Sequence, residues 1–195
     1  MTTQFPALRK IILVILTLVC LPVLAQEDIT VNFQYQGSHN VDLNKMRGTL
    51  RIAEFTDGRG DGNSKLITAS DLGNSAASGG YQAEQPLPEI IRDALAQGFK
   101  QGNAKLVDAD GDMQIVGSLL SSDTTLVDRE GVPSIQITLR TNIQLQGGGR
   151  TIWQTTLFGR GIAPVSEGLA AAVNAALDRT IRELIQDDYF TLEIL

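Results

Sequence analysis

The stretch IQITLRTNIQL, residues 135–145, decides the fold because apolar and polar side chains alternate along it. A period of two is typical of a strand that buries one face. Three glycines, Gly147–Gly149, separate it from a second strand-like run, RTIWQTTLF at residues 150–158. Glycines between two such runs predict an antiparallel hairpin, in which we expect about nine or ten residues to pair.

Two helices with one apolar stripe each are predicted on either side of this hairpin in the sequence. Pro86-Leu87-Pro88 opens the first helix, apolar residues then recur at spacings of three and four, and Gly102-Asn103 ends it. The second helix is expected to be capped by Ser166 and to carry its stripe over residues 169–185. Because each helix has a single apolar stripe, both should lie on one face of a sheet.

Three further runs have strand composition, at residues 29–35, 48–55 and 113–120. The predicted fold is therefore α+β, with the order strand, helix, three-strand meander, helix. The sheet should be mostly antiparallel, with two helices packed on one face. The first helix, as a right-handed crossover, would make the strands at 48–55 and 113–120 parallel neighbours.

The first 25 residues have the three parts of a secretory signal peptide. Arg9-Lys10 precedes an apolar run, and a short segment that ends at Ala25 leads into the polar Gln26. The apolar run is shorter than the roughly 20 residues that cross a bilayer, so a permanent anchor is the weaker alternative. We expect cleavage between Ala25 and Gln26, no transmembrane helix after it, and a periplasmic protein.

Cys20 raises a different possibility, a lipid anchor on the mature chain. The residues before it are Leu18 and Val19, whereas a lipid-modification site has a small residue just before the cysteine. The alternative is that Cys20 belongs to the discarded signal. Mass spectrometry distinguishes an N-terminus at Gln26 from a diacylated Cys20.

The charge of the mature chain excludes some partners. Removing residues 1–25 removes two basic residues and no acid, which leaves 14 basic and 22 acidic residues and a net charge near −8. An acidic chain without a Lys/Arg block lacks the electrostatic footprint of a nucleic-acid-binding protein. No nucleic-acid partner is expected.

The mature chain should consist of an N-terminal strand or extended arm, residues 26–47, and a single α+β domain, residues 48–195. Residues 57–86 are rich in Gly, Ser, Ala and Asn, with a short apolar island at residues 66–68. Such a composition buries too little to offset its ordering entropy of ~1–2 kcal/mol per residue, so we expect a mobile surface loop.

The sequence offers little for catalysis or metal binding. The only cysteine lies in the signal, and the single histidine, His39, has no serine-nucleophile signature near it. Residues 108–112, DADGD, space three carboxylates but lack the glycine and the glutamate of a calcium loop, so a solvated turn is expected. We expect no cofactor and no enzyme activity. An acid–base hydrolase that uses two carboxylates is the alternative.

From Gly48 to Phe190 the chain resembles the YajG-like bacterial envelope proteins, which are usually lipoproteins. The resemblance lies in LRIAEFTDGRGD and PLPEIIRDALAQGF, followed by DMQIVGSLL, SIQITLRTNIQL, RTIWQTTLFGRG and GLAAAVNAALDRTIRELIQDDYF. It implies the same fold and an accessory or binding role in the envelope with no assigned reaction. Among specific residues it carries over Asp57 and Arg59. The family's usual lipid anchor is not matched well at Cys20, and kinship with TolB-type amino-terminal domains is an analogy of fold only.

A non-catalytic envelope protein that binds a protein, a lipid or a glycan is therefore the main functional hypothesis. Two candidate surfaces follow: the loop residues Asp57, Arg59 and Asp61, and the polar side of the 135–145 strand, with Gln136, Arg140 and Gln144. A plainly solvated sheet face is the alternative for the second surface. A third hypothesis is a structural subunit that self-associates through an exposed strand at residues 29–35.

Overall fold

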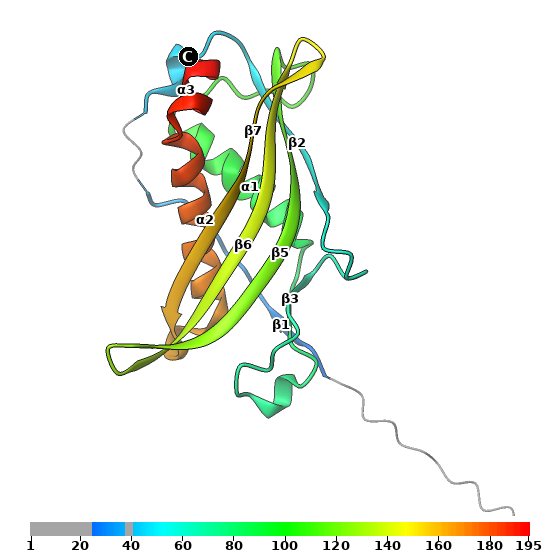
Figure 1. Ribbon diagram of the computed structural model, residues 1–195, viewed down its shortest axis with the longest axis vertical. Coiled ribbons are helices and arrows are strands. Elements are labelled where there is room, and N and C mark those ends of the chain that lie inside the picture. The colour runs from blue at the N-terminus through cyan, green and yellow to red at the C-terminus, as the bar shows by residue number, and fades with distance from the viewer. Residues whose placement is uncertain (1–24, 38–40) are drawn as a thin grey trace, which may run out of the picture.

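The computed structural model describes residues 25–37 and 41–195. The predicted signal peptide, except for Ala25, lies outside the described residues. Cys20 and His39 also lie outside them. The domain consists of a large sheet, a small sheet, and three helices (Figure 1). The large sheet has the order β2-β5-β6-β7, with β2 (Leu50–Asp57), β5 (Met113–Arg129), β6 (Val132–Gly147) and β7 (Arg150–Pro164). The small sheet has the order β1-β4-β3, with β1 (Glu27–Ile29), β3 (Leu66–Thr68) and β4 (Tyr81–Ala83).

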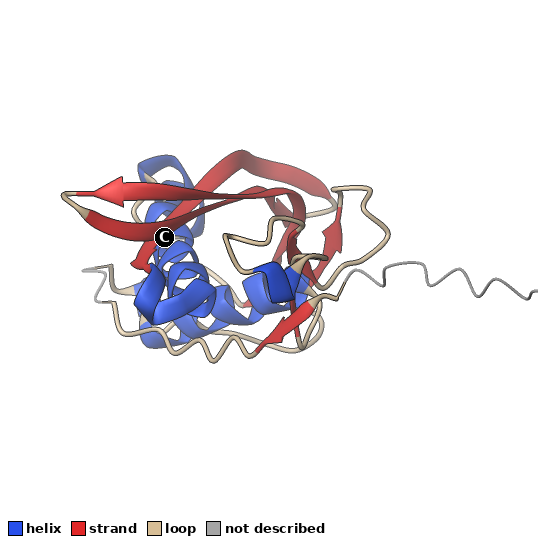
Figure 2. Cartoon of the chain, turned by 90° about the horizontal axis from the view of Figure 1, so that it is seen from below, coloured by secondary structure: helices blue, strands red, loops and turns tan. Residues whose placement is uncertain are grey.

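The predicted α+β fold is confirmed. Strands β5, β6 and β7 form an antiparallel meander. Strand β2 precedes α1 (Leu87–Gln101) in the sequence and β5 follows it, and the two strands pair in parallel. Helices α1 and α2 (Gly168–Ile185) gather under one face of the large sheet (Figure 2). A short third helix, α3 (Asp188–Ile194), follows α2 where a tail was expected.

The meander is longer than its apolar pattern predicts. The β6–β7 ladder runs from the pair Ser134–Pro164 to the pair Gly147–Arg150, with one register shift beside Leu145. The two turns of the meander suit the twist of a tight hairpin, because their central residues have positive φ. These residues are Glu130 (φ 56°) and Gly131 between β5 and β6, and Gly148 and Gly149 between β6 and β7. Strand β5 continues beyond residue 120 through a polar stretch, since β6 supplies a partner along its whole length.

Helix α2 lies unusually close to β7 because the strand has glycines where they meet. A Cβ added to Gly159 would lie 1.9 Å from Thr180 Oγ1, and one added to Gly161 would lie 1.9 Å from the carbonyl oxygen of Ala172. The buried face of the meander and the apolar stripes of the two helices form one continuous core. This core fixes which face of the sheet is covered and which is open.

The start of α2 differs from the prediction. Ser166 is part of a 3-10 turn, Val165–Glu167, and makes no cap; α2 begins at Gly168, whose φ is +80°. A residue with that backbone conformation redirects the chain between the 3-10 turn and the helix. The predicted Ser166 cap is therefore wrong.

The N-terminal arm is extended, but only its start is a strand. Residues 27–29 pair with β4 in parallel, and the following residues pack on the helices instead of joining the sheet. The side chain of Gln97 on α1 takes the place of a neighbouring strand: its Oε1 accepts from the Tyr35 amide at 3.1 Å and its Nε2 donates to the Phe33 carbonyl at 3.2 Å. Phe33 and Tyr35 are both buried.

The segment expected to be a mobile loop, residues 57–86, contains β3, β4 and a 3-10 turn, Ser75–Ala77. Ile67, Ala77 and Ala83 bury their side chains completely or nearly so. The apolar island at residues 66–68 forms β3. Motion of the segment stays a prediction.

Candidate functional site

The open side of the large sheet, which we call the helix-free face, is the surface that bears Gln136, Arg140 and Gln144 of β6. The side chains between them, such as Ile137 and Ile143, are completely buried on the opposite, helix-covered side. Alternation along β6 therefore separates core from surface as predicted. The residues opposite this row across the ladders extend the face, namely Val116, Ser118, Ser121, Asp123 and Thr125 on β5, and Gln154, Thr156, Phe158, Arg160 and Ile162 on β7.

A chain of side-chain amides crosses this face at the end near the β6–β7 turn. Gln114 Nε2 donates to Gln146 Oε1 at 2.9 Å, and Gln146 Nε2 donates to Gln144 Oε1 at 3.1 Å. Since each amide has two donors and one acceptor oxygen, the chain leaves the Gln114 oxygen and the Gln144 amino group without a side-chain partner among the described residues. The ends of the chain thus offer an acceptor and a donor to a ligand.

Near the middle of the face, Arg140 lies over the ring of Phe158, with the guanidinium carbon 5.8 Å from the ring centroid. Phe158 is 53% exposed, which is unusual for an aromatic residue on a sheet. This cation–π contact holds a planar charged group flat on the surface. It adds a cationic, aromatic point of contact to the β6 row, whose other side chains are neutral.

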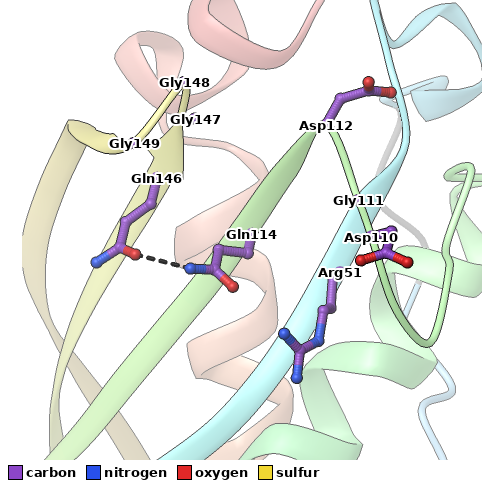
Figure 3. Close-up of a pocket in the computed structure, with 9 residues that line it drawn as sticks. All are labelled: Arg51, Asp110, Gly111, Asp112, Gln114, Gln146, Gly147, Gly148 and Gly149. Atoms are coloured by element: carbon purple, nitrogen blue, oxygen red, sulfur yellow. Dashed lines mark hydrogen bonds between the residues drawn. The ribbon is translucent and has the colours of Figure 1, made fainter.

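A pocket of about 350 Å³ lies where the helix-free face meets the β6–β7 turn (Figure 3). Arg51, Gln114 and Gln146 form its floor as one row across β2, β5 and β6, because the register places Arg51 beside Gln114 and Gln114 beside Gln146. The loop 110–112 and the glycine turn 147–149 form its walls. The pocket is therefore lined by polar side chains and backbone.

Arg51 is the cation of this pocket. It is half-buried, and none of the described residues forms a hydrogen bond or an ion pair with its guanidinium. Figure 3 shows its side chain lying beside Gln114 on the floor. Its five N–H donors have no partner among the residues that the structure describes, so they are available to an oxygen-rich ligand.

The two acids of the pocket have different environments. Asp112 Oδ2 accepts from the Thr49 amide and from the Thr49 hydroxyl, both at 2.8 Å, and these bonds lower the pKa of Asp112. Asp110 has a positive φ of 52° and an exposed side chain. Asp112 therefore fastens the loop to β2 and is a poor general acid.

The predicted loop residues form a structural cluster. Arg59 Nε lies 2.9 Å from Asp57 Oδ1, and Arg59 Nη2 lies 2.6 Å from Asp57 Oδ2, so the pair is bidentate. The same guanidinium donates to the carbonyl oxygens of Leu66, Asn63 and Ser64, and only 5% of its side chain is exposed. Asp61 is farther away, at 3.8 Å, and more exposed.

The Arg59 hydrogen bond is the largest cause of a lowered pKa at Asp57. The structure places this cluster at the start of β3, where Arg59 donates to the Leu66 carbonyl, apart from the row on β6. The Arg59 side chain is directed into the protein, so the cluster holds the segment 59–66 against the end of β2. Binding of a partner by Asp57, Arg59 or Asp61 stays a prediction, with Asp61 the most accessible of the three.

Sequence reasoning missed Arg51, Gln114 and Gln146 as site residues. Arg51 and Gln114 occupy polar positions in predicted strands, and Gln146 directly follows the predicted strand at residues 135–145 and continues its alternation. The signal that they share a row is the register between strands distant in sequence, which alternation within one strand does not give.

Within the described part of the chain, no group of three or more His, Cys, Asp or Glu side chains is arranged to hold a metal ion. The described helices also include none with the length and apolar character needed to cross a bilayer.

The chain matches no protein-family model and no curated protein sequence. Among solved structures, it is similar to protein XCC0632 from Xanthomonas campestris, of the DUF330 family, with a TM-score of 0.57 and 14% identity over 81% of this chain and 92% of that one. At this identity, the likeness concerns the fold.

Lipoproteins are also among the similar structures. A minor lipoprotein from Acinetobacter baumannii has a TM-score of 0.37 and 10% identity over 74% of this chain and 91% of that one. Lipoprotein GNA1162 from Neisseria meningitidis has a TM-score of 0.28 and 12% identity over 69% of this chain and 98% of that one. Likenesses this weak carry no structural argument.

Proposed function

We propose that this chain is a non-catalytic accessory protein of the bacterial envelope, of the YajG-like type, which binds a polar partner on its helix-free face. The observation that carries the proposal is the row of Arg51, Gln114 and Gln146, in which a guanidinium without a partner in the described part of the chain adjoins a chain of amides. Such a row recognises hydroxyl, amide and carboxylate oxygens. Of the three partner classes considered, this favours a protein or a glycan over the acyl part of a lipid.

The envelope location rests on the sequence of the first 25 residues. After cleavage at Ala25 the chain would work in the periplasm, and a lipid on Cys20 would instead tether it to a membrane. In either case the described domain starts within a few residues of the processed end, since β1 begins at Glu27. The mass of the mature N-terminus decides between the two.

A crosslinking experiment in living cells tests the binding face. A photo-crosslinking amino acid is placed at Gln136, Arg140 or Gln144, and at Asn174 on α2 as a control on the helix-covered side. We expect one defined adduct from the β6 positions, absent from the control and strongly reduced when Arg51→Ala and Gln114→Ala are combined. The same adducts from all four positions, or none from β6, would contradict a binding face.

The hydrolase alternative draws on Asp110 and Asp112, which line the same pocket. Acid catalysis needs one carboxyl that keeps its proton near neutral pH. The Thr49 hydrogen bonds act in the opposite direction on Asp112, since they lower its pKa. The pocket therefore supports binding better than hydrolysis. Turnover of an envelope glycan that Asp110→Asn abolishes would reverse this preference.

The structure does not contain the exposed strand on which the hypothesis of self-association through residues 29–35 depended. The predicted exposed strand is an arm whose Phe33 and Tyr35 are buried, and Gln97 occupies backbone groups that a second copy would need. Light scattering on a chain without residues 26–36 would no longer test an exposed edge, because that deletion removes core side chains.

A further inference from the structure

Strand β7 is an unprotected edge of the large sheet. It pairs with β6 on one side, and among the described residues no backbone hydrogen bond reaches residues 150–164 from the other side. In an edge strand every second residue directs its N–H and C=O groups outward. A strand of 15 residues thus presents a long row of unused donors and acceptors.

The opposite edge of the same sheet is treated differently. On β2, the Leu50 amide donates to the Lys105 carbonyl at 2.9 Å, and the Val107 amide donates to the Leu50 carbonyl at 3.0 Å. A register shift also interrupts β2 between Ile52 and Phe55. Coverage and bulges are common protections of an edge. On β7 a register shift lies near the start of the strand, at Ile152, and among the described residues neither protection is present on the outer side of residues 153–164.

A hollow of about 470 Å³ runs along the open edge. Phe158, Arg160 and Ile162 line it from the helix-free face, while Arg179 and Glu183 line it from α2. The two linings come from above and below the strand, so the edge backbone of β7 lies between them. This shape leaves room for one additional extended chain.

The edge is positively charged in an acidic protein. Strand β7 contains Arg150 and Arg160 and no acidic residue, whereas the whole chain has a net charge of −6. The one acid of the hollow, Glu183, is bonded to Arg179 at 2.5 Å. Arg140 adds a further positive charge above Phe158. Two copies of this edge would repel each other, whereas an acidic segment would be attracted.

We infer that β7 is a strand-addition site for an extended, acidic segment of a partner protein. Backbone hydrogen bonds to the open edge supply affinity, and alternate acidic side chains that meet Arg160 supply selectivity. The exposed ring of Phe158 packs against the side chains of the added strand. This site is distinct from the Arg51 row, and it stands whether or not that row binds a ligand.

The test uses an acetylated nine-residue peptide of alternating glutamate and valine, titrated into the isotope-labelled protein and followed by amide NMR. We expect saturable shifts centred on residues 154–164 and slower amide exchange there. The same peptide with every second amide N-methylated loses its outward donors, so its binding should vanish. A peptide with lysine in place of glutamate should bind at least tenfold more weakly, because its charges face Arg160.

Charge reversal in the protein makes the test specific. Arg160→Glu should weaken the glutamate peptide roughly tenfold and strengthen the lysine peptide, whereas the matched control Arg92→Glu on α1 should change neither. Arg51→Ala should also leave peptide binding unchanged, which separates this site from the row of Arg51, Gln114 and Gln146. Binding that survives N-methylation, shifts away from β7, or no binding at millimolar peptide would overturn the inference. A stable dimer of the free protein paired through β7 would overturn it as well.

Discussion

Replacing Arg59 by methionine tests whether a buried ion pair holds the segment 57–86 in place. The side chain of Arg59 is 5% exposed, that of its partner Asp57 is 20% exposed, and Nη2 and Oδ2 are 2.6 Å apart. Methionine keeps much of the aliphatic length and removes every donor. The variant removes the guanidinium from the Asp57 carboxylate and from the Leu66 carbonyl, and it leaves the carboxylate with the backbone amide of residue 59.

The expected loss is about 3 kcal/mol in the free energy of unfolding. Removing one partner of a buried pair costs ~3–5 kcal/mol because it leaves an uncompensated charge, and the partial exposure of Asp57 favours the lower end. That is a large part of the ~5–15 kcal/mol that stabilises a typical domain. The exposed pair Arg179–Glu183 is the matched control, and Arg179→Met should cost about 0.5 kcal/mol or less.

Urea unfolding followed by tryptophan fluorescence measures both variants. The chain has one tryptophan, Trp153, whose ring centroid lies 5.0 Å from that of Phe190, far from the altered loop in sequence. The double variant Asp57→Asn with Arg59→Met should recover part of the loss, since no charge is then left unpaired.

The pH dependence provides a second check. Arg59 lowers the pKa of Asp57 below its ordinary value of 3.8, so the pair stabilises the native state fully above that pH. The contribution disappears as the pH falls through the lowered pKa, and the difference between the native protein and Arg59→Met should narrow there. A loss below about 1 kcal/mol at neutral pH, or a difference that stays constant on acidification, would refute the reasoning.

Three further predictions concern packing. Gly161→Ala should destabilise the protein by about 1–3 kcal/mol in urea unfolding, because the new methyl group would meet the Ala172 carbonyl, and the loss should be larger than for alanine at an open turn glycine. Gln97→Ala should speed hydrogen exchange of the Tyr35 amide without changing that of the meander, as NMR would show. Phe190→Ala should cost about 3–5 kcal/mol and shift the indole emission to longer wavelength, since the ring contacts both the tryptophan and another buried phenylalanine.

The meander and the helices could be predicted because their side chains repeat with the period of the structure. The alternation of residues 135–145 identified β6 and its buried face, and the helical stripes identified the covered side. The length of β5 could not be predicted, since residues 121–125 are polar on both sides of the strand. It is a strand because β6 lies beside it, and pairing overrides local preference.

The segment 57–86 shows a second limit. Its composition indicated too little apolar surface for order, yet Arg59 organises its start through a buried charge and three backbone carbonyls. A rule based on hydrophobicity does not detect a buried arginine that stabilises a segment through its hydrogen bonds. The Arg51 row was missed for a related reason, since its members become neighbours only through the register of strands distant in sequence.

The two edges of the large sheet have unequal status, with consequences for assembly. A sheet that is accessible at both margins can propagate, since every unit that accepts a neighbour still offers a free margin to the next. Here some backbone groups of the β2 edge are already bonded to residues of the same chain. A segment bound at β7 therefore does not lead to further extension of the sheet. The architecture thus favours stoichiometric one-to-one complexes over fibres, and it keeps an aggregation hazard confined to a single strand.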